Sequence, residues 1–114
     1  GTSVSYGRTW TAERDTVIAT VPVGYGDGLP RRASPGLFVG VGGKPYPVVG
    51  RICMDQCMVD LGPDNEARRW DKVTVFGPAP APQSAADIAS RVGTIPYEIT
   101  CNVNKRVPRV YVGE

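Results

Sequence analysis

The chain has 114 residues, a hydrophobic content of 41%, a charged content of 21% and a formal net charge of +2. This length fits one domain that buries its own core, and the composition is ordinary for a globular protein. The small net charge gives no support for nucleic-acid binding, and no apolar run approaches the roughly 20 residues of a membrane-spanning helix. The absence of histidine removes the commonest general base and most zinc sites.

The first residues lack the basic-then-apolar order of a signal peptide. The chain begins at Gly1 in strand-like sequence, and we expect further sequence upstream of it. Three cysteines, Cys53, Cys57 and Cys101, are an odd number for a disulfide framework, and they indicate a reducing, cytoplasmic environment.

Short apolar runs bounded by glycine and proline predict a mostly β fold. Strands are expected at residues 16–23, 37–41, 46–49, 52–61, 72–76 and 106–112. Gly42 and Gly43 form a two-residue hairpin signal. Ser84 is expected to cap a helix that Gly93 ends, and residues 94–104 stay open between a loop and a second short helix after Pro96. We therefore predict a β-barrel-like or sandwich domain with one or two short helices.

The segment from Gly50 to Asp60 contains two cysteines, two methionines and two carboxylates. Its composition fits a soft-metal site, a redox pair, a catalytic carboxylate or plain core. On an extended strand Cys53 and Cys57 share a face about 13 Å apart, which is too far for a disulfide or one metal ion. Asp55 and Asp60 would point to opposite faces of such a strand. We expect buried thiols here, with no metal site and no simple acid/base pair.

The glycine-rich run at residues 24–30 is not followed by an apolar-periodic helix, which argues against a phosphate-binding loop. Tyrosine remains as an acid/base candidate, because a neighbouring charge or hydrogen bond can lower its pKa from near 10. The chain has five tyrosines, and half-buried strand or turn positions explain most of them equally well. From these residues alone the chain is a β domain without a self-sufficient active site.

Five motifs occur in order along the chain, at residues 4–9 (VSYGRT), 22–28 (PVGYGDG), 50–58 (GRICMDQCM), 96–99 (PYEI) and 106–109 (RVPR). Together they strongly resemble the C-terminal domain of bacterial alanine racemase, and the likeness runs over residues 1–114. The resemblance implies a mostly β domain that follows an N-terminal (β/α)8 barrel, of which no part is present here. In that family the barrel binds pyridoxal 5'-phosphate covalently through a lysine.

The resemblance implies separate roles for several residues. Tyr6 matches the catalytic tyrosine, which comes from the partner subunit of a head-to-tail homodimer. Racemisation needs two bases, because a planar α-carbon must be reprotonated from the face opposite to the one that lost its proton. The cofactor lysine serves one face of alanine and Tyr6 the other.

Other matches concern binding. Met54 corresponds to the position whose backbone N–H contacts the substrate carboxylate, and Tyr97 to the tyrosine whose hydroxyl reaches the cofactor phosphate. Tyr25 and Arg31 match residues of the substrate entryway, although a turn aromatic that packs on the barrel rim remains an alternative for Tyr25.

Several alternatives stay open. Serine racemases and racemases of broader specificity share much of the pattern, whereas pyridoxal-phosphate decarboxylases pair a similar barrel with a β domain of different motifs. A free-standing β-barrel binding module would need a basic, aromatic-rich face. We expect the isolated chain to fold but neither to bind the cofactor tightly nor to racemise alanine.

Overall fold

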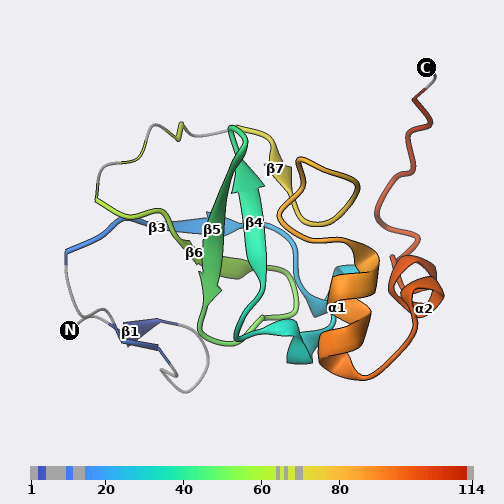
Figure 1. Cartoon of the computed structure of the whole chain (residues 1–114). Coiled ribbons are helices and arrows are strands. Elements are labelled where there is room, and N and C mark those ends of the chain that lie inside the picture. The colour runs from blue at the N-terminus through green and yellow to red at the C-terminus, as the bar shows by residue number, and fades with distance from the viewer. Residues whose placement is uncertain are drawn as a thin grey trace.

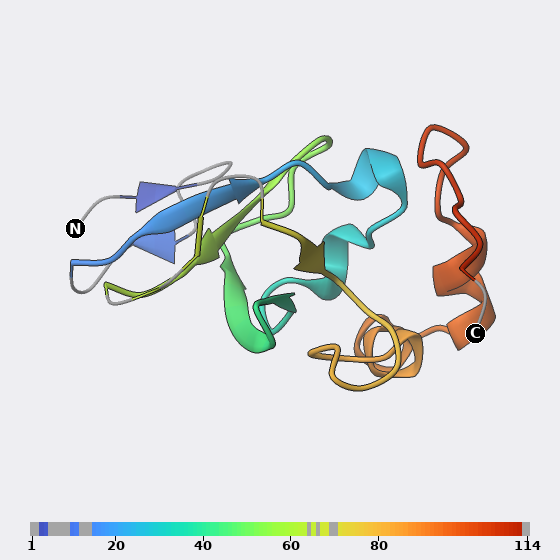
Figure 2. The same ribbon diagram turned by 90° about the horizontal axis from the view of Figure 1, so that it is seen from above.

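The computed structural model of the protein describes residues 3–4, 10–11, 15–63, 65, 67–68 and 71–112. Its main element is a five-stranded antiparallel sheet with the strand order β3-β6-β5-β4-β7. The strands are β3 (Ile18–Val21), β4 (Phe38–Val41), β5 (Lys44–Val49), β6 (Cys57–Asp60) and β7 (Val73–Thr74). A separate hairpin of β1 (Ser3–Val4) and β2 (Trp10–Thr11) lies at the end of the molecule opposite to the helices (Figures 1 and 2).

The β4–β5 hairpin forms where the glycine pair predicts it. Val41 pairs with Lys44 across a turn in which Gly42 and Gly43 have φ angles of 60° and 79°. A two-residue hairpin turn of this kind needs positive φ at both central positions, and glycine adopts it without steric cost.

Alternation along the strands separates the core from the surface. In β6, Cys57 and Val59 are fully buried while Met58 and Asp60 are only partly buried. Successive side chains of a strand point to opposite faces, so the sheet turns one apolar face inward. The largest fully buried side chains are Leu37, Ile52, Ile88, Ile99, Val39, Val59 and Cys57.

Two helices close one end of this core. Helix α1 (Ala85–Val92) begins at Ser84, whose side chain accepts a hydrogen bond from the Asp87 N–H, and ends at Gly93 with φ 81°. Helix α2 (Pro96–Cys101) packs against α1, and both insert isoleucines into the core. The capped helix is therefore confirmed, and residues 94–104, which the sequence left open, contain a short helix after Pro96. The mostly β, barrel-like fold is confirmed as well: the sheet forms half a barrel.

The continuous strand expected over residues 52–61 is wrong in its first half. Residues 53–56 form a turn, here the Met54 turn, in which the Cys53 N–H donates to the Gln56 carbonyl at 2.9 Å. The strand starts only at Cys57. Gly50 has φ 72°, which breaks the extended backbone, and the carbonyls of Cys53 and Met54 accept hydrogen bonds from a loop instead of a neighbouring strand.

The strand expected at residues 106–112 is also wrong. This segment continues past α2 and leads away from the sheet, with no strand edge beside it (Figure 1). Val110, Tyr111 and Val112 are 80–91% exposed. β-Branched and aromatic residues favour a strand only where a partner strand can pair with them.

In the described part of the chain, no helix is long and apolar enough to span a bilayer.

Candidate functional site

Two loops meet at backbone level beside the Met54 turn. The second is the η2 loop (residues 24–28), built around the 3₁₀ helix η2 (Tyr25–Asp27). The Tyr25 N–H donates to the Cys53 carbonyl at 3.0 Å, and the Gly26 N–H donates to the Met54 carbonyl at 2.8 Å. A Cβ atom on Gly24 would overlap both of these carbonyl oxygens. The approach therefore requires glycine at position 24 because of space, since the Gly24 φ of −150° is ordinary extended backbone.

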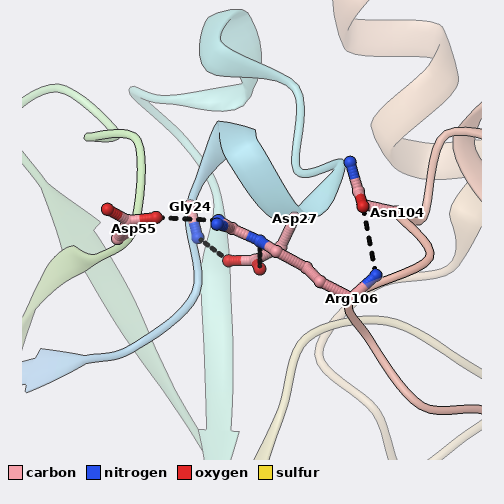
Figure 3. A network of polar contacts seen from close by, with 5 residues as sticks. All are labelled: Gly24, Asp27, Asp55, Asn104 and Arg106. Atoms are coloured by element: carbon pink, nitrogen blue, oxygen red, sulfur yellow. Dashed lines mark hydrogen bonds and ion pairs between the residues drawn. The ribbon is translucent and has the colours of Figure 1, made fainter.

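Asp27 closes the η2 loop from inside. Its Oδ2 accepts a hydrogen bond from the Gly24 N–H at 2.9 Å, and its Oδ1 accepts one from Arg106 Nε at 2.7 Å (Figure 3). The Gly24 hydrogen bond is the largest cause that holds the pKa of this carboxyl below 3.8, and the Arg106 guanidinium adds to it.

Arg106 makes a second ion pair, in which its Nη2 donates to Asp55 Oδ1 at 2.8 Å. Figure 3 shows the guanidinium between the two carboxylates. The backbone of this segment is fixed as well: the Arg106 N–H donates to Asn104 Oδ1 at 3.1 Å, and the Asn104 N–H donates to the Asp27 carbonyl at 2.9 Å. We call the set of Arg106, Asp27 and Asp55 the Arg106 bridge.

The lowered pKa of Asp27 predicts a pH dependence of stability. A carboxyl whose pKa is lower in the folded state stabilises the fold above its unfolded pKa, and this contribution is lost as the pH falls through the folded value. Urea unfolding from pH 7 to pH 2 should show wild-type stability declining from about pH 4 downward. Asp27→Asn should be less stable at pH 7 and decline more shallowly. An equally steep decline in Asp27→Asn would assign the acid sensitivity to other carboxyls.

Met54 offers a backbone donor at the edge of this network. Met54 is 49% exposed, and its carbonyl accepts a hydrogen bond from the Gly26 N–H. Its own N–H donates to no acceptor among the described residues. An N–H group in this state can donate a hydrogen bond to an anionic group such as a carboxylate.

The cysteines of this region are buried free thiols, as expected for Cys53 and Cys57, while Cys101 is exposed. Burial raises the pKa of the Cys57 thiol to about 11, with a further contribution from the neighbouring Cys53. A thiol that stays protonated is a poor nucleophile and a poor metal ligand. No cluster of three or more metal-binding side chains occurs among the residues that the structure describes.

The other predicted site residues are distributed unevenly. Tyr25 and Arg31 line one cavity of about 630 Å³ between the η2 loop and the helices. Glu98 of α2 also lines this cavity. Tyr97 is 79% exposed and does not line this cavity. Tyr6 lies outside the described residues.

Sequence reasoning missed the Arg106 bridge. Arg106 is separated from Asp27 by 79 positions and from Asp55 by 51, so no local pattern joins them. The only available signal was that all three residues lie in motifs already singled out, at residues 22–28, 50–58 and 106–109.

Comparison with known proteins identifies the family to which this fold belongs. The model of the family described as "Alanine racemase, C-terminal domain" matches residues 1–111. The chain belongs to this family.

Individual relatives agree with this family membership. An alanine racemase of Treponema denticola is 54% identical over 99% of this chain and 31% of its own length. The crystal structure of alanine racemase from D-cycloserine-producing Streptomyces lavendulae superposes with a TM-score of 0.91 at 46% identity, covering 100% of this chain and 30% of that one. The alanine racemase of Bartonella henselae with covalently bound pyridoxal phosphate gives 0.88 at 34% identity, over 98% and 31%. The chain thus spans about 30% of these relatives.

Proposed function

We propose that residues 1–114 are the C-terminal domain of a longer, pyridoxal-phosphate-dependent alanine racemase that interconverts L- and D-alanine. The observation that supports this most directly is the family match over residues 1–111. In this proposal an N-terminal (β/α)8 barrel supplies the cofactor lysine, and two chains form a homodimer. The buried free thiols suit a reducing compartment, and we place the enzyme in the cytoplasm.

The residues of this chain fit the proposed cofactor in one respect. The Tyr97 side chain is exposed and makes no hydrogen bond to a described residue through its hydroxyl, so it is free to donate to a phosphate oxygen. Pyridoxal phosphate, when bound, supplies an electron sink that stabilises negative charge at the α-carbon. A relative from Bartonella henselae contains it covalently bound.

Three further roles belong to residues of this chain: binding the substrate carboxylate, moving a proton on one face of the α-carbon, and lining the route of entry. The Met54 N–H, which has no acceptor among the described residues, binds and orients the substrate carboxylate, and this places the α-carbon. In the active site of the partner subunit, the phenolic oxygen of Tyr6 takes the α-proton from one enantiomer of alanine, and a proton is delivered to the opposite face by the lysine of the proposed barrel. When the other enantiomer reacts, the lysine takes the proton and the Tyr6 hydroxyl gives one to its own face. Tyr25 and Arg31 line the route by which substrate enters, consistent with the cavity they share.

A substrate panel on the full-length protein tests this function. With pyridoxal phosphate present, L-alanine and D-alanine should each approach an equal mixture by chiral chromatography, and serine should react more slowly. The isolated 114-residue chain should show no racemisation and no absorbance band of bound cofactor. Faster turnover of serine would favour the serine racemases, and no turnover of any amino acid would contradict the proposal.

A further inference from the structure

Arg106 connects three segments that lie far apart in the sequence. Its Nε donates to Asp27 and its Nη2 donates to Asp55, so two guanidinium nitrogens bind two different carboxylates (Figure 3). Asp27 is the last residue of η2, which also contains Tyr25. Asp55 follows Met54 directly in the Met54 turn. The guanidinium has the reach and the planar, fixed geometry to set the spacing between these two loops.

The outer part of the Met54 turn depends on such contacts because residues 54–56 are exposed, although Cys53 at its start is buried. The Asp55 side chain is 68% exposed, and Met54 as a whole residue is 49% exposed. Backbone hydrogen bonds from Tyr25 and Gly26 support the turn from one side, and Arg106 supports it on the exposed side. Without Arg106 the peptide that presents the Met54 N–H keeps fewer restraints.

The bridge also has an electrostatic consequence. Asp27 and Asp55 are two carboxylates close to a backbone donor that, in the proposed function, receives the carboxylate of the substrate. Negative charges near that donor weaken the binding of an anion, and a positive charge paired with them offsets the repulsion. Arg106 provides this charge at 2.7 and 2.8 Å from the two carboxylates.

A large contribution to overall stability is not expected. The Arg106 side chain is 46% exposed, and exposed ion pairs stabilise folded proteins little because water and salt screen them. The consequence of the bridge is therefore local to the two loops.

We propose that Arg106 is a positioning residue for substrate binding: it fixes the Met54 peptide through Asp55 and the Tyr25 loop through Asp27, and it offsets their negative charge. This inference rests on the proposed racemase function. Arg106 itself does not touch the substrate in this proposal, so its removal should affect KM more than kcat.

The kinetic test uses the full-length protein. Arg106→Met should raise the KM for alanine about tenfold, the lower end of what loss of one hydrogen bond to a charged group produces, and should change kcat by less than about threefold. Arg106→Lys should give an intermediate KM, because it keeps the charge but not both contacts. Arg109→Met is the matched control, since Arg109 donates to the Val103 carbonyl and forms no ion pair with Asp27 or Asp55. An unchanged KM in Arg106→Met overturns the positioning role.

A second measurement does not require racemase activity. Hydrogen exchange in the substrate-free protein should be faster in Arg106→Met than in wild type or Arg109→Met, at residues 24–28 and 51–57 but not in α1. Asp55→Asn, which removes one contact at an exposed position, should speed exchange at residues 51–57 alone. If exchange is unchanged in both Arg106→Met and Asp55→Asn, the positioning role of Arg106 is overturned, whatever the racemase activity. If Arg106→Met exchanges faster than wild type but the full-length wild-type protein does not racemise alanine, the proposed function is overturned and the role of Arg106 in holding the two loops is supported.

Discussion

Replacement of Tyr6 by phenylalanine in the full-length protein is expected to stop α-proton exchange for one enantiomer of alanine while the other continues to exchange. Tyr6 is proposed to serve a single face of the α-carbon, and the cofactor lysine serves the opposite face. Loss of the phenolic oxygen removes one of the two proton carriers. Racemisation, which needs both, should fall by about 10²–10⁴-fold, the range for a general acid or base.

Proton exchange in deuterated water, followed separately for each enantiomer, measures this directly. Tyr111→Phe is a suitable control, because Tyr111 is 91% exposed and has no proposed role. It should exchange both enantiomers at wild-type rates. Equal loss of exchange for L- and D-alanine in Tyr6→Phe would contradict the assignment of one base to each face.

Replacement of Gly24 by alanine should separate the η2 loop from the Met54 turn. The added Cβ would overlap the carbonyl oxygens of Cys53 and Met54, which belong to the backbone and cannot rotate away as a side chain does. Forcing extra atoms into a packed site typically costs about 1–3 kcal/mol. Because the same carbonyls bond to Tyr25 and Gly26, we expect the upper part of this range in the 114-residue chain and severe loss of racemase activity in the full-length protein.

Gly42→Ala is the matched control for this effect. Gly42 has φ 60° and no atom within 4 Å of an added Cβ, so alanine there meets backbone strain but no overlap. That strain costs about 1–2 kcal/mol. Urea unfolding of the 114-residue chain should therefore show the larger loss for Gly24→Ala, and only Gly24→Ala should reduce activity. If Gly24→Ala and Gly42→Ala have equal stability and full activity, the close approach of the two loops does not require glycine at position 24.

The elements that were predicted correctly depend on short-range signals. Ser84 and Gly93 bound α1 because a serine oxygen can accept a backbone N–H and glycine adopts positive φ, both within one helix. The Gly42-Gly43 turn depends on the same freedom of glycine. The motif-based resemblance to alanine racemases is likewise confirmed by the family match.

The two wrong strands show where such signals end. Residues 106–112 contain three valines and a tyrosine, and residues 52–56 were expected to be the first half of one strand over 52–61, yet a strand also requires a partner edge. The η2 loop takes the carbonyls of Cys53 and Met54, and no strand lies beside residues 106–112 in the described structure.

Local chemistry along the chain was sufficient to establish its family, its β character, its helix ends and its buried thiols. The placement of Arg106 between Asp27 and Asp55 required the folded chain. Hydrogen-bonding and backbone preferences act over a few residues, whereas an ion pair across 51 or 79 positions exists only after distant segments have packed together. For the same reason the Met54 N–H could be assigned a role from a motif, while the loop contacts that hold it in place became visible only in three dimensions.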